Sequence, residues 1–578
     1  MEPHRALGSP AAAPLAGAPL AEAPFADAPL EVCTERLGGS PLALAALAGR
    51  TPPTWYPTAP DSPAAWGDHA GVVRQQFRAG AWLELLAPAL EAEGPAAARL
   101  ERSAAGAGVV VTTGQQPGLF GGPLYVLSKA LSARALADEI ERATGVPVAP
   151  VFWAATDDAD FAEASRTIVA VDGDARVLAA SATAPEGTPM SAVPLGDDVA
   201  ALRAALEEAA GSAAYHPALD AVRAAYVPGA TVGGAYVRLL RALLQPLGVA
   251  VLDASHPAVR EGSFQLLRRA LLAAPAIERA LAERSAEITA AGFVPQVPDV
   301  PGRSLVFLDG DDGRKARVPV AEARSLVTRV PRGALGPNVL LRPVVERFIL
   351  PTVGYVAGPG EYAYFAQASA VAAALAVAPP VVVPRWSGTV IEPAVRRALT
   401  RLGVEAAGLA DPHAVAARVA RRALSPAVAE TIAALREATR AAGARLHAEA
   451  HATGDVVPRT AVDGALLAVA HRVDRLERRY LAALKQRDDA DTRALATARA
   501  ALYPGGSRQE RALAFAPLLA RHGPALTDAM LERASEHAEA LVQGGLAGVL
   551  GRGAEPGGAP AAGTGAAADA APASAEPA

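Results

Sequence analysis

The chain is poor in cysteine, in excess positive charge and in long apolar runs, and each scarcity excludes a class of protein. Cys33 is the one cysteine among 578 residues, which rules out an intrachain disulfide framework and a zinc site built from cysteines. Lys and Arg number 54 against 59 Asp and Glu, a net charge of −5, so there is no basic field to hold nucleic acid. No uncharged apolar run is long enough to span a membrane, and no apolar stretch typical of a signal peptide follows the N-terminus. We expect a cytoplasmic protein without a nucleic-acid or membrane partner, in which Cys33 is an incidental thiol.

Common catalytic signatures are missing as well. The histidines show no H-E-x-x-H or other ligand spacing, so a histidine-based metal site is not expected. A G-x-S-x-G elbow and the H-I-G-H and K-M-S-K-S signatures of class I synthetases are absent. General motif rules therefore do not name a reaction for this chain.

The strongest structural signal begins at Gly108. Val109, Val110 and Val111 form an apolar run typical of a strand buried on both faces. A glycine-rich segment follows at 112–123, and the apolar spacing beyond it predicts a helix from near Pro123 to Gly145. Residues 146–153 have the pattern of the next strand. This order predicts one βαβ unit of a parallel sheet.

Similar signals continue along the first two thirds of the chain. Strands are predicted at 249–252, 304–308 and 381–383, with helices between them, for example at 237–244 and 266–281. We therefore expect an α/β fold: a Rossmann-like parallel-sheet core with inserted or appended pieces.

The strand signals end after Glu392. A helix is predicted from about 426 to 451, and 453–458 turns the chain into a second helix. Apolar residues of this second helix step by three and four, as in the seam of a coiled coil: Leu466, Val469, Val473, Leu476 and Tyr480. We expect a long antiparallel hairpin that serves as a scaffold or a dimer contact.

These signals divide the chain into five segments. They are a low-complexity N-terminus (1–30), the Rossmann-like core (31–392), the helical coiled-coil arm (393–500), a C-terminal helical segment packing on the core (501–552) and a disordered tail (553–578).

The glycine-rich segment after the first strand is the leading candidate for a binding site. Ligands of open parallel sheets bind outside the carboxyl ends of the strands. Gly114 allows close backbone approach, and Gln115 and Gln116 offer amide donors and acceptors. The segment is neither a G-x-G-x-x-G nor a Walker A sequence, and a tight turn that needs glycine is the alternative interpretation.

An acidic segment at 157–163 follows the next predicted strand and should lie beside the first loop. Clustered carboxylates there can bind a metal or an amine, or act as a general base. A solvated acidic turn with helix-capping aspartates is the alternative.

Two further segments carry polar residues in turns. The segment 338–367 contains Arg342, suited to a carboxylate or phosphate, and Glu361 just after a Gly-Pro-Gly turn, and a buried turn with ordinary helix caps is the alternative. Arg385 follows the strand predicted at 381–383 and is a further anion-binding candidate, with a salt bridge as the alternative. The segment 505–511 could hold phosphate or could simply be an exposed helix start.

These segments resemble the motifs of the BshC family of cysteine ligases, in the same order over about residues 110–525. The resemblance rests on Thr113 to Gly118, Gly122 to Tyr125 with Lys129, Pro147 to Trp153, the acidic segment, Pro337 to Pro343, Leu350 to Val356, Gly358 to Gln367, Pro384-Arg385 and Gln509-Glu510-Arg511. The family has a histidine in its acidic motif where this chain has Ala159, so a role for that histidine is not carried over.

The resemblance implies a Rossmann-like core with connecting subdomains, and a coiled-coil arm that mediates homodimers. It implies a ligase that adds cysteine to glucosaminyl-malate to form bacillithiol. ATP, with Mg²⁺ accompanying it, is the implied energy source, and an ADP or ATP site is expected. The implied catalytic residues are Asp158, Asp160 and Glu163. The implied substrate-binding residues are Gly114, Gln115, Gln116, Tyr125, Lys129, Arg342, Glu361, Tyr364, Gln367 and Arg385. The implied nucleotide-binding residues are Arg508, Gln509 and Arg511.

Two other classes of function stay open from sequence alone. One is a different enzyme on the same sheet, a sugar transferase or an N-acyl hydrolase. The other is a non-enzymatic interaction protein built around the coiled-coil arm.

Overall fold

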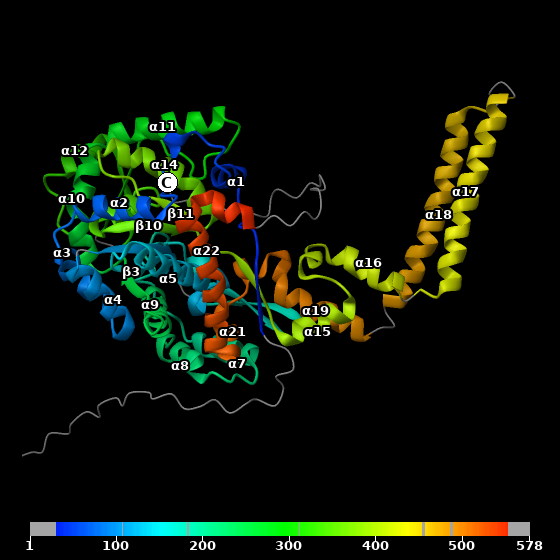
Figure 1. Ribbon diagram of the computed structural model, residues 1–578, viewed down its shortest axis with the longest axis horizontal. Coiled ribbons are helices and arrows are strands. Elements are labelled where there is room, and N and C mark those ends of the chain that lie inside the picture. The colour runs from blue at the N-terminus through cyan, green and yellow to red at the C-terminus, as the bar shows by residue number, and fades with distance from the viewer. Residues whose placement is uncertain are drawn as a thin grey trace, which may run out of the picture.

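The protein consists of an α/β body and a long two-helix arm that projects away from it (Figure 1). The computed structural model describes residues 30–552 apart from 107, 182–183, 311–312, 423, 453–456 and 486–488. The segments predicted at 1–30 and 553–578 lie outside the described residues, except for residue 30, as does most of the turn predicted between the two long helices.

A five-stranded parallel sheet forms the centre of the body, in the order β11-β10-β2-β3-β6. Its strands are β2 (Val109–Gln115), β3 (Val148–Ala154), β6 (Ala250–Asp253), β10 (Thr352–Ala357) and β11 (Val382–Pro384). From β2 the chain adds β3 and β6 on one side and later returns to add β10 and β11 on the other. The strand order therefore reverses between β2 and β10, where open α/β sheets bind their ligands.

The predicted βαβ unit is confirmed as β2, α5 (Leu124–Thr144) and β3. The helix begins one residue after Pro123 and ends at Gly145, whose φ of 71° lies in the left-handed region that favours glycine. Both strands are buried along almost their whole length, as the apolar run at Val109 predicts.

Helices cover both faces of the sheet, and one hydrophobic core lies on each face. The helices on one face are α3 (Ala81–Leu90), α4 (Gly94–Ala105), α10 (Pro257–Leu272), α11 (Ala274–Ala290), α12 (Val320–Leu326), α13 (Arg342–Ile349) and α14 (Pro359–Ala374). Those on the other are α2 (Pro63–Arg74), α5, α8 (His216–Ala225), α9 (Val232–Leu244), α21 (Phe515–His522) and α22 (Pro524–Arg552).

Smaller sheets surround this core. The strand predicted at 304–308 is present as β7 (Arg303–Asp309), but it pairs antiparallel with β8 (Lys315–Pro319) and β9 (Leu335–Pro337) in a separate sheet. The hairpin of β4 (Arg166–Val171) and β5 (Asp174–Ala179) and the pair of β1 (Glu31–Thr34) and β12 (Gly388–Ile391) complete the strands of the described residues. Short helices α1 (Pro41–Leu47), α6 (Phe161–Ala164), α7 (Val199–Ala210) and α20 (Gln509–Ala512) lie between these elements.

The arm consists of α17 (Pro426–Ala452) and α18 (Arg459–Lys485), joined to the body through α15 (Pro393–Leu402), α16 (Pro412–Arg422) and α19 (Asp489–Leu502). The predicted hairpin is confirmed, but its predicted seam is only partly right. Val473 is buried, whereas Val469, Leu476 and Tyr480 are 45%, 42% and 44% exposed and so do not pack in the hairpin. No helix in the described part of the chain is both long and apolar enough to cross a membrane.

Candidate functional site

The site lies at the carboxyl ends of β2 and β10, where the strand order reverses. Gly114 and Gln115 end β2, and Glu361 begins α14 directly after β10. Gly114 lies so close to β3 that a Cβ atom there would be 2.8 Å from the carbonyl oxygen of Trp153. Glycine is therefore required at this position by the approach of the neighbouring strand.

A buried ion pair joins the two strand ends. Lys129 of α5 places its Nζ 2.5 Å from Oε2 of Glu361, and it also donates to the carbonyl of Gly114 and to Oε1 of Gln115, 3.1 Å away. Burial lowers the pKa of Lys129, although Glu361 opposes the effect. Burial would raise the pKa of Glu361, but Lys129 and Arg342 outweigh it and hold that pKa below its usual range.

A second charged group extends this network across β10. Arg342, at the start of α13, donates to the hydroxyls of Tyr355 (3.1 Å) and Tyr364 (2.9 Å) and to Oε2 of Glu346 (2.9 Å). The Tyr355 hydroxyl donates in turn to Glu361. Burial raises the pKa of Glu346 to about 7 even though Arg342 opposes it. Lys129, Glu361 and Arg342 thus belong to one continuous network.

The amides of Gln115 and Gln116 are held in place by this network. Nε2 of Gln115 donates to Oε1 of Gln116 at 2.7 Å, while its own oxygen accepts from Lys129. Both side chains are half-buried, so the amide group of Gln116 is available at the edge of the sheet.

The acidic segment follows β3 on the other side of β2. Asp160 caps α6 by accepting from the backbone N–H of Glu163 at 3.0 Å, and Asp158 accepts from the N–H of Ala159 at 2.7 Å. Burial raises the pKa of Asp158, with Lys315 opposing the rise. Glu163 is exposed as a whole residue, yet the protein atoms around its carboxyl and the charges of Asp158 and Asp160 raise its pKa to about 7.

Arg385 follows β11 and is almost fully buried. It forms a two-pronged ion pair with Glu510 of α20, at 2.7 and 2.9 Å, and Ser387 donates to the same carboxylate at 2.9 Å. The carbonyl of Pro384 accepts from His537 of α22 at 2.9 Å, and burial lowers the pKa of His537 to about 4, so this histidine is neutral. These contacts fasten α20 and α22 to the end of β11.

Three of the predicted residues lie in other surroundings. The buried amide of Gln367 exchanges hydrogen bonds of 3.0 and 2.8 Å with the backbone of Val297, and that of Gln509 does the same with Val390 at 2.8 and 2.9 Å. Arg508 forms an ion pair with Glu35. Their polar groups are thus already bonded within the protein.

Several residues of the site were missed by sequence reasoning. Tyr355 joins Arg342 to Glu361, and Lys315 of β8 donates to the carbonyl of Asp157 at 2.7 Å. Tyr355 lay inside a segment that carried the family resemblance, and Glu346 follows Arg342 by four residues, the spacing of an ion pair on one helix face.

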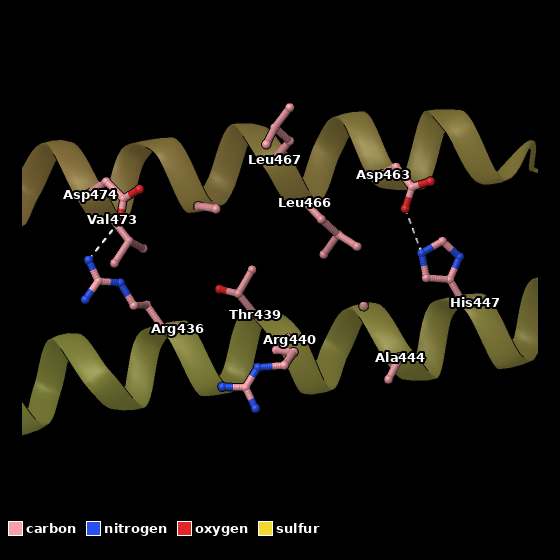
Figure 2. Close-up of a pocket in the computed structure, with 12 residues that line it drawn as sticks. Arg436, Thr439, Arg440, Ala444, His447, Asp463, Leu466, Leu467, Val473 and Asp474 are labelled. Atoms are coloured by element: carbon pink, nitrogen blue, oxygen red, sulfur yellow. Dashed lines mark hydrogen bonds and ion pairs between the residues drawn. The ribbon is translucent and has the colours of Figure 1, made fainter. Parts of the chain in front are cut away.

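The arm, which projects away from the body, carries a groove of about 670 Å³ between α17 and α18 (Figure 2). Leu466 and Val473 lie along it, and Arg436 bonds Asp474 at 2.8 Å while His447 contacts Asp463 at 2.8 Å. These two contacts join α17 to α18 across the groove.

Two further features bear on the chemistry open to the site, namely the thiol of Cys33 and clusters of potential metal ligands. Burial and the neighbouring Glu31 raise the pKa of Cys33 to about 11, so its thiol is protonated at neutral pH. The structure shows no group of three or more potential metal ligands within the ranges it describes.

Comparison with known proteins agrees with this architecture. Residues 82–386 match the family model "Bacillithiol biosynthesis BshC, N-terminal Rossmann-like domain", and residues 388–541 match the corresponding C-terminal coiled-coil domain. The chain thus has the two domains of a bacillithiol biosynthesis protein, a Rossmann-like domain followed by a C-terminal coiled-coil domain. It belongs to the BshC family.

Curated relatives extend over most of the chain. A protein of Solibacter usitatus is 32% identical over 451 residues, which cover 76% of this chain and 84% of the relative. One of Koribacter versatilis is 32% identical over 468 residues, covering 78% and 86%. Both carry the name "Putative cysteine ligase BshC".

Proposed function

We propose that this chain is a cytoplasmic ligase that joins the carboxyl group of cysteine to the amine of glucosaminyl-malate and so forms bacillithiol. Membership of the BshC family, whose curated members are named cysteine ligases, is the observation that carries the proposal. The side chains gathered at the carboxyl ends of β2, β3 and β10 support it, because they combine an acid–base group with amide and cationic groups.

Glu163 is the proposed general base of this reaction. A pKa of about 7 leaves its carboxylate able to accept a proton at neutral pH and suits that role. Asp158 and Asp160 are each bonded to a backbone N–H, whereas the carboxyl of Glu163 makes no hydrogen bond with the described residues. The amine nitrogen forms the new bond to the activated cysteine carbonyl, its proton passes to Glu163, and the activating group leaves.

Gln115 and Gln116 are the proposed partners of the sugar hydroxyls. Lys129 fixes the amide of Gln115, so the pair of amides is oriented before substrate arrives. Such preorganisation lowers the entropic cost of binding.

ATP is the proposed co-substrate, because an amide bond from a free acid needs an activated carboxyl group. The predicted nucleotide-binding segment 508–511 fits this poorly, since Arg508 and Gln509 are bonded to Glu35 and Val390. We therefore propose no residue for the nucleotide, and Mg²⁺ would accompany its phosphates.

Mass spectrometry of the reaction tests the proposal. Purified protein is incubated with glucosaminyl-malate, cysteine and Mg-ATP, and each component is omitted in turn. We expect bacillithiol only in the complete mixture, and a loss of at least a hundredfold in kcat for Glu163→Gln. A separate incubation with bacillithiol and no ATP would identify an N-acyl hydrolase if it released cysteine, and no turnover in any mixture would refute the ligase.

We also propose that the arm forms a homodimer. Val469, Leu476 and Tyr480 occur at intervals of seven and four residues, so they form one exposed apolar stripe along α18. A stripe of this kind on a two-helix arm would be covered by a second copy in a four-helix arrangement.

Sedimentation equilibrium tests the dimer. The double variant Val469→Glu/Tyr480→Glu should sediment as a monomer, whereas Arg478→Glu, half a turn round the same helix, should remain a dimer. A wild-type monomer at micromolar concentration would contradict the proposal.

A further inference from the structure

Most cations at the carboxyl edge of the sheet are already neutralised by carboxylates of the chain, Lys315 among them through Asp157. Lys129 pairs with Glu361, Arg342 with Glu346, and Arg385 with Glu510. Each of these bonds is between buried or nearly buried groups, so replacing the internal carboxylate by a ligand would leave a buried charge unpaired. A substrate anion at this edge needs a different cation.

Arg511 is the cation that remains. It is half-buried, and its side chain makes no hydrogen bond or salt bridge with any residue that the structure describes. Its neighbour along the chain, Arg508, is by contrast held by Glu35. Arg511 is therefore a guanidinium with its donors unused.

The segment that carries Arg511 is firmly placed between the two candidate loops. Just after it, the carbonyl of Leu513 accepts from the backbone N–H of Leu124 at 2.9 Å, which binds it to the first turn of α5. The N–H of Ala514 donates to the carbonyl of Ile168 in β4 at 2.8 Å, close to the acidic segment. The body thus fixes the backbone that carries Arg511 beside both loops.

Two side chains of the site share the electrostatic field of Arg511. Burial is the main cause that raises the pKa of Tyr125 and of Glu163, and the charge of Arg511 opposes the rise in both. Tyr125 stands in the first turn of α5 and its hydroxyl has no hydrogen-bond partner among the described residues. The backbone contacts of the segment after Arg511 and these shared charges therefore place its guanidinium near Tyr125 and Glu163.

We infer that Arg511, with the hydroxyl of Tyr125, binds a carboxylate of the substrate and holds the substrate amine toward Glu163. The inference deepens the proposed function, since it assigns the malyl carboxylates of the acceptor to these two residues. Guanidinium and phenol donors suit a carboxylate, and an Arg–carboxylate bond in a half-buried site is among the stronger polar contacts. It also gives Arg511 a substrate role rather than the nucleotide role expected from sequence.

Calorimetric titration with L-malate alone tests this inference by measuring binding in the absence of turnover. The dimethyl ester of malate serves as the uncharged probe, and Arg508→Gln serves as the matched control because that arginine is already paired. We expect Arg511→Gln to weaken malate binding at least tenfold, and Tyr125→Phe to weaken it several-fold. Ester binding should be the same in all four proteins.

Folding of the variants is checked by thermal unfolding, and Arg511→Lys retains the charge if the glutamine variant is unstable. It should bind malate with intermediate affinity, because lysine lacks the planar fork of donors. The inference is overturned if wild-type protein does not bind malate at millimolar concentration, if Arg511→Gln binds it normally, or if Arg508→Gln loses as much. Malate binding that depends on Arg511 in a protein without ligase turnover would refute the proposed function alone.

Discussion

The Lys129–Glu361 ion pair is the structural centre of the site, and a double-mutant cycle can measure it. Lys129→Met removes the cation but keeps the length of the side chain, and Glu361→Gln removes the anion with little change in shape. Breaking one side of a buried pair costs about 3–5 kcal/mol of the free energy of unfolding. The remaining partners set the value within that range.

Both remaining partners keep some of their bonds. After Lys129→Met, Glu361 still accepts from the N–H of Gly358 at 2.8 Å and from Tyr355. After Glu361→Gln, Lys129 still donates to the Gly114 carbonyl and Gln115. We therefore expect each single change to cost about 3 kcal/mol, near the lower limit.

The double variant should lose much less free energy of unfolding than the two single variants lose together. Each single change already breaks the pair, so Lys129→Met/Glu361→Gln should lose about 3–4 kcal/mol and give a coupling energy of about 2–3 kcal/mol. Urea unfolding followed by tryptophan fluorescence measures the free energy of unfolding of the body without the arm, because all five tryptophans lie in the body: Trp55, Trp66, Trp82, Trp153 and Trp386. A loss of about 6 kcal/mol in the double variant, the sum of the two single losses, would show that the two side chains do not stabilise each other.

Two further predictions concern pH. Glu392 accepts from Arg521 at 2.7 and 3.0 Å and from His522 at 2.7 Å, and these partners outweigh burial and lower its pKa from 4.5 to about 2. A lowered carboxyl pKa contributes stability above about pH 4.5 that is lost as the pH falls toward 2. Glu392→Gln should therefore have a lower melting temperature than wild type at pH 7, and the difference should narrow below pH 4.5. A difference in melting temperature that stays constant with pH would contradict this. Lys315→Met removes the charge that opposes the raised pKa of Asp158, so that pKa should rise further when the carboxyl groups are titrated by NMR. An unchanged titration of Asp158 would contradict this.

Helices and strands that are marked by apolar runs, prolines and glycines within their own residues were predicted from the sequence. The apolar run at Val109 and the proline and glycine that bracket α5 predicted β2, α5 and β3, with α5 and β3 placed to within two residues. The end of β2 was wrong, because the strand continues from Val111 to Gln115 through residues predicted as a loop. The strand β10 was missed because Pro351 and Gly354 are strand breakers by local rules, and its place between β2 and β11 is decided by tertiary packing. The pattern at 304–308 gave a strand correctly but held no information on which sheet it joins.

The same limit applies to the site. Lys129, Arg342, Glu361 and Arg385 were all singled out, and the salt bridge given as the alternative for Arg385 is confirmed, but the partners in these ion pairs were not foreseen. Lys129 meets a carboxylate more than two hundred residues away, and no periodicity encodes such a contact. Arg511 stands out as an unpaired cation only when the ion pairs of the other cations are known from the structure.

Hydrogen exchange with mass spectrometry tests most directly that the carboxyl edge of the sheet is the substrate site. We expect saturating glucosaminyl-malate to slow exchange in 114–125, 157–165 and 509–514, and to leave exchange in α17 and α18 unchanged. Protection confined to the arm, with none at the ends of β2 and β3, would contradict it.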